Sequence, residues 1–163
     1  MGDRINAGLY VFNTSIITRI PSKPTSIERE IFPIMAKEEE LFAMDLAGFW
    51  MDVGQPKDYL SGISLYLNSV KSSRCEPNSM NIIGNVIIDP SAKVHKSAVL
   101  GPDVVVGENC VVGEGVRLQK TCLFKGVKVG GHSWVDNSII GWNSTVGQWV
   151  FIVYYFFIYL GQN

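Results

Sequence analysis

The stretch AVLGPDVVVGENCVVGEGVRL, residues 98–118, carries an aliphatic residue at every sixth position. Steps of six in both directions give seven aliphatic positions, and a small or β-branched residue follows each of them four positions later. The aliphatic set is Ile82, Ile88, Val94, Leu100, Val106, Val112 and Leu118, and the second set is Val86, Ala92, Ala98, Val104, Cys110, Val116 and Cys122. A six-residue period is typical of a coil in which each repeat supplies one flat face and one corner.

Glycines and two phase shifts complete the pattern. Gly101, Gly107 and Gly113 each follow an aliphatic position directly, where a tight corner favours a residue without a Cβ. Beyond Leu118 the phase slips by one residue, twice. The slipped positions are Leu123, Val129 and Val135, then Ile140, Val146 and Ile152. Each slip is a five-residue step, at which we expect a slightly irregular face and not a break.

Other folds fit this period less well. An amphipathic α-helix would place apolar residues at i, i+3, i+4 and i+7, and the glycines would weaken it. An antiparallel β-sandwich would place turn signals about every 8–12 residues. The sequence therefore predicts a parallel β-helix over residues 82–150, with both sets of repeat positions, Cys110 and Cys122 among them, pointing into the coil.

The composition narrows the class of protein. The 163 residues carry a formal net charge of −1 and 47% of them are hydrophobic, which is a globular composition. This charge gives no general reason to expect nucleic acid or a membrane as a partner. The three cysteines, Cys75, Cys110 and Cys122, are odd in number and lack metal-ligand spacing, and no signal-peptide pattern is visible. We expect a cytoplasmic protein.

The first 70 residues predict a smaller region of mixed structure. Strands are expected at residues 4–12, 41–47 and 49–53. Helices are expected to begin near Ile27 and near Pro56, and Thr25 and Glu28 have the spacing of a capping box at the first helix. Three strands and two helices leave sheet edges uncovered, so we expect this region to be part of a larger α/β domain.

Several segments resemble the sugar nucleotidyltransferase family. They are RINAGLY (4–10), PTSIEREIFP (24–33) and GFWMDVGQPKD (48–58). With GNV (84–86), DPSA (89–92), GW (141–142) and VGQW (146–149), they are similar to the eukaryotic mannose-1-phosphate guanylyltransferases, specifically their catalytic beta-type subunits. The resemblance implies an α/β remnant of a nucleotidyltransferase (Rossmann-like) domain followed by a left-handed parallel β-helix of hexapeptide repeats.

The resemblance also implies a reaction and its participants. The family joins GTP and mannose 1-phosphate to give GDP-mannose and pyrophosphate, with Mg²⁺ neutralising charge on the phosphates. Its subunits assemble into homo- or hetero-oligomers through their carboxy-terminal coils. We therefore expect GTP, mannose 1-phosphate, Mg²⁺ and full-length guanylyltransferase subunits to be the partners relevant to this chain.

Three residues match functional positions of the family, and a fourth is a candidate. Asp52 matches one of two carboxylates that hold Mg²⁺, a cation that prefers one or two carboxylates together with water and phosphate oxygens. Asn6 and Gly8 match positions that contact the sugar, and Glu28 is a third candidate there. Each also has a purely structural explanation: a turn before Gly54 for Asp52, a strand irregularity for Asn6 and Gly8, and the capping box for Glu28.

The chain departs from the family at both ends. The family's amino-terminal half, with its glycine-rich nucleotide loop, has no counterpart here, so we expect the chain alone to be inactive. Residues 151–163 are expected to form a divergent apolar tail, too short for a bilayer span of roughly 20 residues. The predicted organisation is a partial nucleotidyltransferase domain at 1–70, a linker at 71–81, the β-helix at 82–150 and this tail.

Three functions remain open from the sequence. The first is a partial guanylyltransferase. The second is a non-catalytic β-helix that acts as an interaction or regulatory subunit of a guanylyltransferase complex. The third is a hexapeptide-repeat acyltransferase, which would need a catalytic histidine in a groove between coils, and His95 and His132 lack any supporting motif.

Overall fold

The computed structural model describes residues 4–70 and 81–154. The chain divides into two compact units, residues 1–50 and 51–163. The predicted linker therefore lies outside the described residues except for its last position, and so does the predicted tail beyond Tyr154.

The described part of the first unit contains helices but no strands. The helices are α1 (Ile16–Arg19), η1 (Ile27–Ile31) and α2 (Phe32–Lys37). The strands predicted at residues 4–12, 41–47 and 49–53 are wrong for this structure, because those residues are irregular and unpaired. A strand exchanges backbone hydrogen bonds with a neighbour, and the described residues contain no such exchange for these segments.

The start of the helix at Ile27 differs from the predicted capping box. Ser26, not Thr25, is the N-cap, and its Oγ accepts a hydrogen bond from the Arg29 N–H at 3.2 Å. Glu30, not Glu28, completes the cap, because its Oε1 accepts from the Ser26 N–H at 2.8 Å. The first turn is a wide π-helical one, so the residue four positions after the cap reaches back to it. The cap therefore does not explain Glu28.

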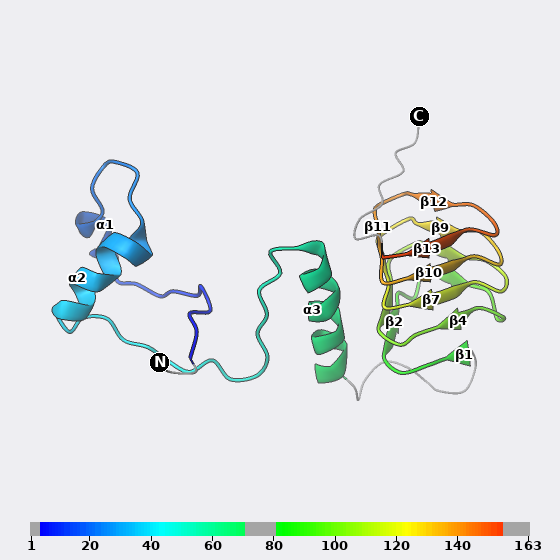
Figure 1. Cartoon of the computed structure of the whole chain (residues 1–163), viewed down its shortest axis with the longest axis horizontal. Helices are drawn as coiled ribbons and strands as arrows, with labels where there is room; N and C mark the ends of the chain where they lie inside the picture. Colours follow the sequence, from blue (N-terminus) through cyan, green and yellow to red (C-terminus); the bar gives the residue numbers. More distant parts are fainter. Residues whose placement is uncertain (1–3, 71–80, 155–163) are drawn as a thin grey trace. The chain divides into compact units, whose positions relative to one another are not determined.

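The second unit consists of helix α3 (Pro56–Ser69), as predicted, and a parallel coil (Figure 1). The strands of the coil are β1 (Asn81–Ile82), β2 (Val86–Ile88), β3 (Lys93–Val94), β4 (Val99–Leu100), β5 (Val104–Val106), β6 (Val111–Val112), β7 (Arg117–Gln119), β8 (Cys122–Leu123), β9 (Lys128–Val129), β10 (Trp134–Asp136), β11 (Ile139–Ile140), β12 (Thr145–Val146) and β13 (Phe151–Val153). They form three parallel sheets with the orders β1-β4-β7-β10-β13, β11-β8-β5-β2 and β12-β9-β6-β3. The result is a β-solenoid of about four turns, consistent with the left-handed β-helix that the family resemblance implies.

The core of the coil confirms the six-residue repeat. The aliphatic positions from Leu100 to Ile152 are buried, and Ile82, Ile88 and Val94 pack against them at the first turn. The five-residue steps are also confirmed. Val99 lies opposite Arg117 in the parallel register, 18 residues later, whereas Arg117 lies opposite Trp134, only 17 residues later. β13 carries the coil on to Val153, past residue 150.

The first five-residue step, from Leu118 to Leu123, changes which residue of the following corner points into the coil. Lys120 adopts a left-handed backbone conformation, with φ of 43°, and the buried Thr121 follows it in the corner. The Thr121 hydroxyl donates to the carbonyl of Gln119 (2.6 Å) or Val135 (3.2 Å), so its burial is satisfied. The step thus falls before Cys122, and the prediction that Cys122 points into the coil is wrong.

Cys122 instead lies beneath helix α3. It forms a second buried cluster with Leu60 and Ile139, against which Ile63 and Phe124 pack. Polar contacts secure the same helix to the coil: the Ser64 hydroxyl donates to Asp103 Oδ2 at 2.9 Å, and Asn85 Nδ2 donates to Asn68 Oδ1 at 3.0 Å. Helix α3 therefore covers one sheet of the coil.

The covered thiol leads to a chemical prediction. Burial raises the pKa of Cys122 to about 12 from its ordinary value of 9.0, so the thiol stays protonated and unreactive at pH 8. Leu60→Asp should undock helix α3 and make Cys122 react with iodoacetamide at least about tenfold faster, measured by mass spectrometry of the Cys122 peptide. Cys110, buried inside the coil, is the internal control and should stay slow in both proteins. Equal Cys122 rates in the two proteins would contradict the docking.

Candidate functional site

Three of the four predicted site residues lie together in the first unit. Asn6 Nδ2 donates to the Tyr10 hydroxyl at 2.6 Å and lies 3.4 Å from Glu28 Oε1. The Tyr10 hydroxyl in turn donates to Glu28 Oε1. The Gly8 N–H donates to Asn6 Oδ1 at 2.8 Å. The structure therefore brings Asn6, Gly8 and Glu28 into one hydrogen-bonded cluster.

Local backbone conformation explains how residues so close in sequence meet. Gly8 has a φ of 71°, a conformation that favours glycine, and it turns the chain so that its own N–H points back to Asn6. A Cβ at Gly8 would have nothing within 4 Å. The space above this backbone is thus open, as a site for a sugar ring requires.

Tyr10 is a member of the cluster that the sequence analysis missed. Its ring contacts those of Phe32 and Phe12, with centroids 5.0 and 5.7 Å apart, so the aromatic group joins this segment to the start of α2, which directly follows the η1 turn that carries Glu28. The hydrogen bond to the Glu28 carboxylate raises the pKa of the Tyr10 hydroxyl, which stays protonated as a donor. The available signal was that Tyr10 is part of the same RINAGLY segment as Asn6 and Gly8.

The cluster has the chemistry of a polyol site. It combines an amide and a carboxylate on exposed chain segments, and these groups donate to and accept from the hydroxyls of a sugar. Hydrogen bonds to a charged carboxylate are also stronger than those between neutral groups.

Asp52 belongs to the second unit, and its local geometry is a turn. Its Oδ1 accepts a hydrogen bond from the Gly54 N–H at 3.0 Å, which is the structural explanation weighed from the sequence. The side chain is exposed, so Oδ2 remains available as one oxygen ligand for Mg²⁺. Within residues 4–70 and 81–154 no group of three His, Cys, Asp or Glu side chains could hold a metal ion. Asp52 therefore fits a metal site only as one of its ligands.

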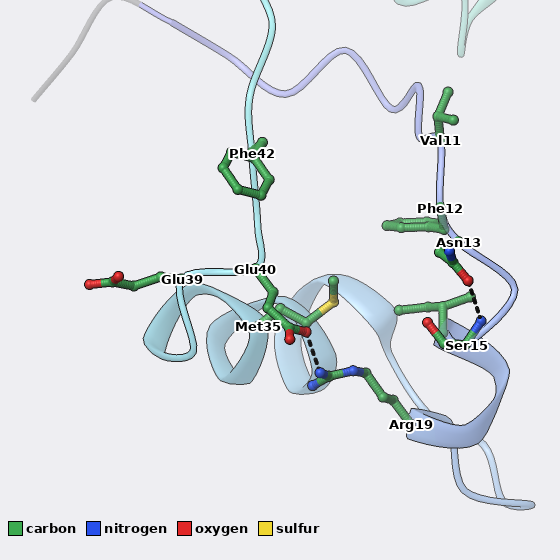
Figure 2. A pocket seen from close by; sticks show the side chains of 10 residues that line it. Val11, Phe12, Asn13, Ser15, Arg19, Met35, Glu39, Glu40 and Phe42 are labelled. Atoms are coloured by element: carbon green, nitrogen blue, oxygen red, sulfur yellow. Dashed lines mark hydrogen bonds and ion pairs between the residues drawn. The ribbon is translucent and has the colours of Figure 1, made fainter.

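A separate hollow of about 380 Å³ lies in the first unit (Figure 2). Its lining mixes apolar and polar side chains: Val11, Phe12, Ile16, Met35 and Phe42 are apolar, and the lining residue Arg19 forms an ion pair with Glu40, which also lines the hollow. None of Asn6, Gly8 and Glu28 lines it. The hollow is therefore distinct from the polar cluster.

Sequence comparisons match each of two long segments of the chain to a protein family. The family described as "Nucleotidyl transferase" matches residues 2–69, and the family described as "GMPPB C-terminal domain" matches residues 82–158. The "Mannose-1-phosphate guanyltransferase" of Gibberella zeae is 58% identical over 154 residues. The chain belongs to the mannose-1-phosphate guanylyltransferase family. Another relative in this family is the "Mannose-1-phosphate guanylyltransferase catalytic subunit beta" of Danio rerio, 48% identical over 152 residues.

These matches cover most of this chain but less than half of each relative. The Gibberella zeae match spans 91% of the chain and 42% of that guanyltransferase, and the Danio rerio match spans 92% and 42%. The "Probable mannose-1-phosphate guanylyltransferase 3" of Oryza sativa shows the same coverage, 91% and 42%, at 49% identity. The chain thus corresponds to about two fifths of a family member.

Proposed function

We propose that the chain supplies the mannose 1-phosphate side of a mannose-1-phosphate guanylyltransferase site. The observation that carries this proposal is the hydrogen-bonded cluster of Asn6 and Gly8, which match sugar-contacting positions, with Glu28, the third candidate. The names of the relatives supply the substrate. The cap formed by Ser26 and Glu30 removes the main alternative explanation for Glu28.

In the reaction, a phosphate oxygen of mannose 1-phosphate attacks the α-phosphorus of GTP, and pyrophosphate leaves as the bond to the bridging oxygen breaks. Asn6 and Glu28 would hold the sugar hydroxyls, and Gly8 would let the ring approach the backbone. Asp52 would provide one ligand to Mg²⁺, which supplies positive charge to the phosphates. GTP would bind the part of the nucleotidyltransferase domain that this chain does not span, so the chain alone would be inactive.

A titration tests this proposal. The chain should bind mannose 1-phosphate, followed by NMR. Asn6→Ala or Glu28→Ala should weaken the affinity by about tenfold or more, because each removes hydrogen bonds to the sugar hydroxyls, and those accepted by the Glu28 carboxylate involve a charged group. Asn13→Ala is the matched control, since Asn13 caps the Ser15 N–H outside the cluster, and it should bind normally.

The outcomes separate the two halves of the proposal. Equal binding by all four proteins, or none by the unaltered chain, would contradict the sugar site. Pyrophosphate release by the chain with GTP and Mg²⁺, above an Asp52→Ala background, would contradict inactivity alone.

A second candidate function is a non-catalytic β-helix subunit of a guanylyltransferase complex, in homo- or hetero-oligomers with full-length subunits. The hydrophobic core of the coil favours it, because every residue of that core cluster comes from the coil itself. A chain that binds no sugar phosphate but coelutes with a full-length relative would support this function over the first. No helix in the described part of the chain is long and apolar enough to cross a membrane. Separately, we propose that the protein is located in the cytoplasm, as expected from the sequence.

A further inference from the structure

The turn that carries Asp52 leads directly into helix α3. The helix begins at Pro56, four residues after Asp52, and the Pro56 ring restricts the backbone at its first position. The Gln55 carbonyl accepts the first hydrogen bonds of the helix, from the N–H groups of Asp58 at 2.9 Å and Tyr59 at 3.1 Å. The backbone between the turn and the helix is therefore short and restrained, so a movement of one is passed to the other.

Val53 packs against the helix that follows it. A Cβ built at Gly62, in the second turn of helix α3, would lie 3.3 Å from Val53 Cγ1. A Cβ at Gly54 would lie at the same distance, 3.3 Å, from Asp52 Oδ1, the oxygen that accepts the Gly54 N–H. Both distances are shorter than an ordinary contact of 3.4–4 Å. Because glycine is a poor helix former, the space that Val53 occupies is the physical reason for a glycine at position 62.

The coil holds the opposite side of the same helix. Leu60 and Cys122 share the second buried cluster, and the Ser64 hydroxyl donates to Asp103 Oδ2 at 2.9 Å. Residues 60 and 64 lie on one face of the helix, and residue 62 lies about 160° around the axis from both of them at 3.6 residues per turn. Helix α3 therefore lies between the coil and Val53.

We propose that Val53 and Gly62 are positioning residues for Asp52. Their packing lets the coil, through helix α3, hold the turn so that Asp52 Oδ1 stays bonded to the Gly54 N–H and Oδ2 is left to bind a divalent cation. Neither residue has a polar side-chain atom to offer a ligand, so both act through Asp52. The inference rests on the proposed function for the role of Asp52 as a metal ligand.

The chemistry of Mg²⁺ makes such positioning important. Mg²⁺ demands nearly ideal octahedral geometry and uses only one or two carboxylates, so a displaced carboxylate has few substitutes. A misplacement of about 1 Å in a reacting site can cost roughly a hundredfold in rate. Asp52 is exposed and has only the Gly54 N–H as a printed partner among the described residues. The fit of Val53 against Gly62 is therefore the restraint that links this side chain to a buried part of the fold.

A double-mutant cycle in the full chain tests the proposal. Gly62→Ala should displace Val53, and Val53→Ala should remove its contact with the helix. Each single variant should speed hydrogen exchange of the Gly54 amide at least about threefold, measured by NMR, because the bond to Asp52 Oδ1 opens more often. The double variant should return to the unaltered rate, since the methyl group added at position 62 fills the space that Val53→Ala vacates.

Ser61→Ala is the matched control. Ser61 is an exposed neighbour of Gly62 on the same helix, and its hydroxyl donates to the Lys57 carbonyl, away from Val53. The change improves helix propensity as Gly62→Ala does, and it should leave Gly54 exchange unaltered. All four variants should melt at or above the temperature of the unaltered chain, followed by circular dichroism, because Val53 is 55% exposed and alanine favours the helix.

A titration with Mn²⁺, a cation that shares the oxygen ligands of Mg²⁺, supplies the second readout. Bound Mn²⁺ should broaden the amide signals of residues 52–54, and Asp52→Ala should abolish that broadening. The Mn²⁺ concentration that gives half of the effect should rise at least about threefold in each single variant and return in the double variant.

The outcomes distinguish this inference from the proposed function. If Gly54 exchange is the same in the single variants as in the unaltered chain, or if the double variant restores nothing, the inference is wrong, whatever the sugar titration shows. A complete cycle in exchange together with Mn²⁺ broadening that ignores Asp52→Ala would support the positioning of the turn and contradict the proposed role of Asp52. A complete cycle in both readouts, with no binding of mannose 1-phosphate, would support the inference and contradict the sugar site.

Discussion

Val106→Asp is expected to unfold the coil. Val106 is 1% exposed, and its neighbours in register on the adjacent turns are Ile88 and Leu123. A carboxylate there would have an apolar surrounding and no partner, which costs several kcal/mol. Because small domains are stable by only about 5–15 kcal/mol, thermal unfolding followed by circular dichroism should show a midpoint lowered by more than about 10 °C or no transition at all.

The matched control for this variant is Val111→Asp. Val111 is also a strand valine of the coil, but it points outward and is 39% exposed. Its aspartate would remain hydrated, so the midpoint should change little. Equal shifts for the two variants would show that the inward and outward positions of the repeat are assigned incorrectly.

Gly101→Ala is expected to have the second-largest effect. Gly101 has a φ of 107°, which L-residues rarely adopt, and a Cβ built there would lie 1.8 Å from the carbonyl oxygen of Ile83 on the preceding turn. The conformation alone costs about 1–3 kcal/mol for a residue with a side chain, and the clash adds to it because backbone must move. The free energy of unfolding, measured by urea denaturation, should fall by at least about 3 kcal/mol.

Gly147→Ala is the control for this glycine. Gly147 also lies in a corner of the coil, yet a Cβ there would meet only Val150 Cγ2 at 3.7 Å, an ordinary contact. The substitution should be neutral or stabilise the coil by up to about 1 kcal/mol, because alanine restricts the unfolded chain. A denaturation midpoint for Gly101→Ala that matches that of Gly147→Ala would contradict the close approach of the two turns.

The coil could be predicted because its information is local. Every six residues repeat the same choice of an aliphatic inward residue and a corner, and each choice is visible in the sequence. Whether Cys122 points into the coil or out of it was not visible in this way, because the answer depends on where within residues 118–123 the five-residue step falls. It depends on Lys120 turning the corner and on the Thr121 hydroxyl finding the Gln119 or Val135 carbonyl, and the second of these lies on the next turn.

The first unit was harder to predict because pairing is not a local property. Residues 4–12 and 41–47 have the composition of strands, but a strand forms only where another backbone accepts its hydrogen bonds. The role of Glu28 was hard to predict for a similar reason, because it depends on backbone geometry that the sequence does not show. A one-residue shift of the cap and a π-helical turn decide whether its carboxylate serves the helix or the Tyr10 hydroxyl.

Helix α3 has a further consequence for recombination between family members. By sequence, residues 56–69 belong to the nucleotidyltransferase match, whereas in the structure they cover Cys122 and Ile139 of the coil. A chimera joined near residue 70 would pair the coil of one relative with the covering helix of another, and the contacts of Leu60 and Ser64 would have to match by chance. A junction near residue 50, between the two units, would carry helix and coil together as one exchangeable block.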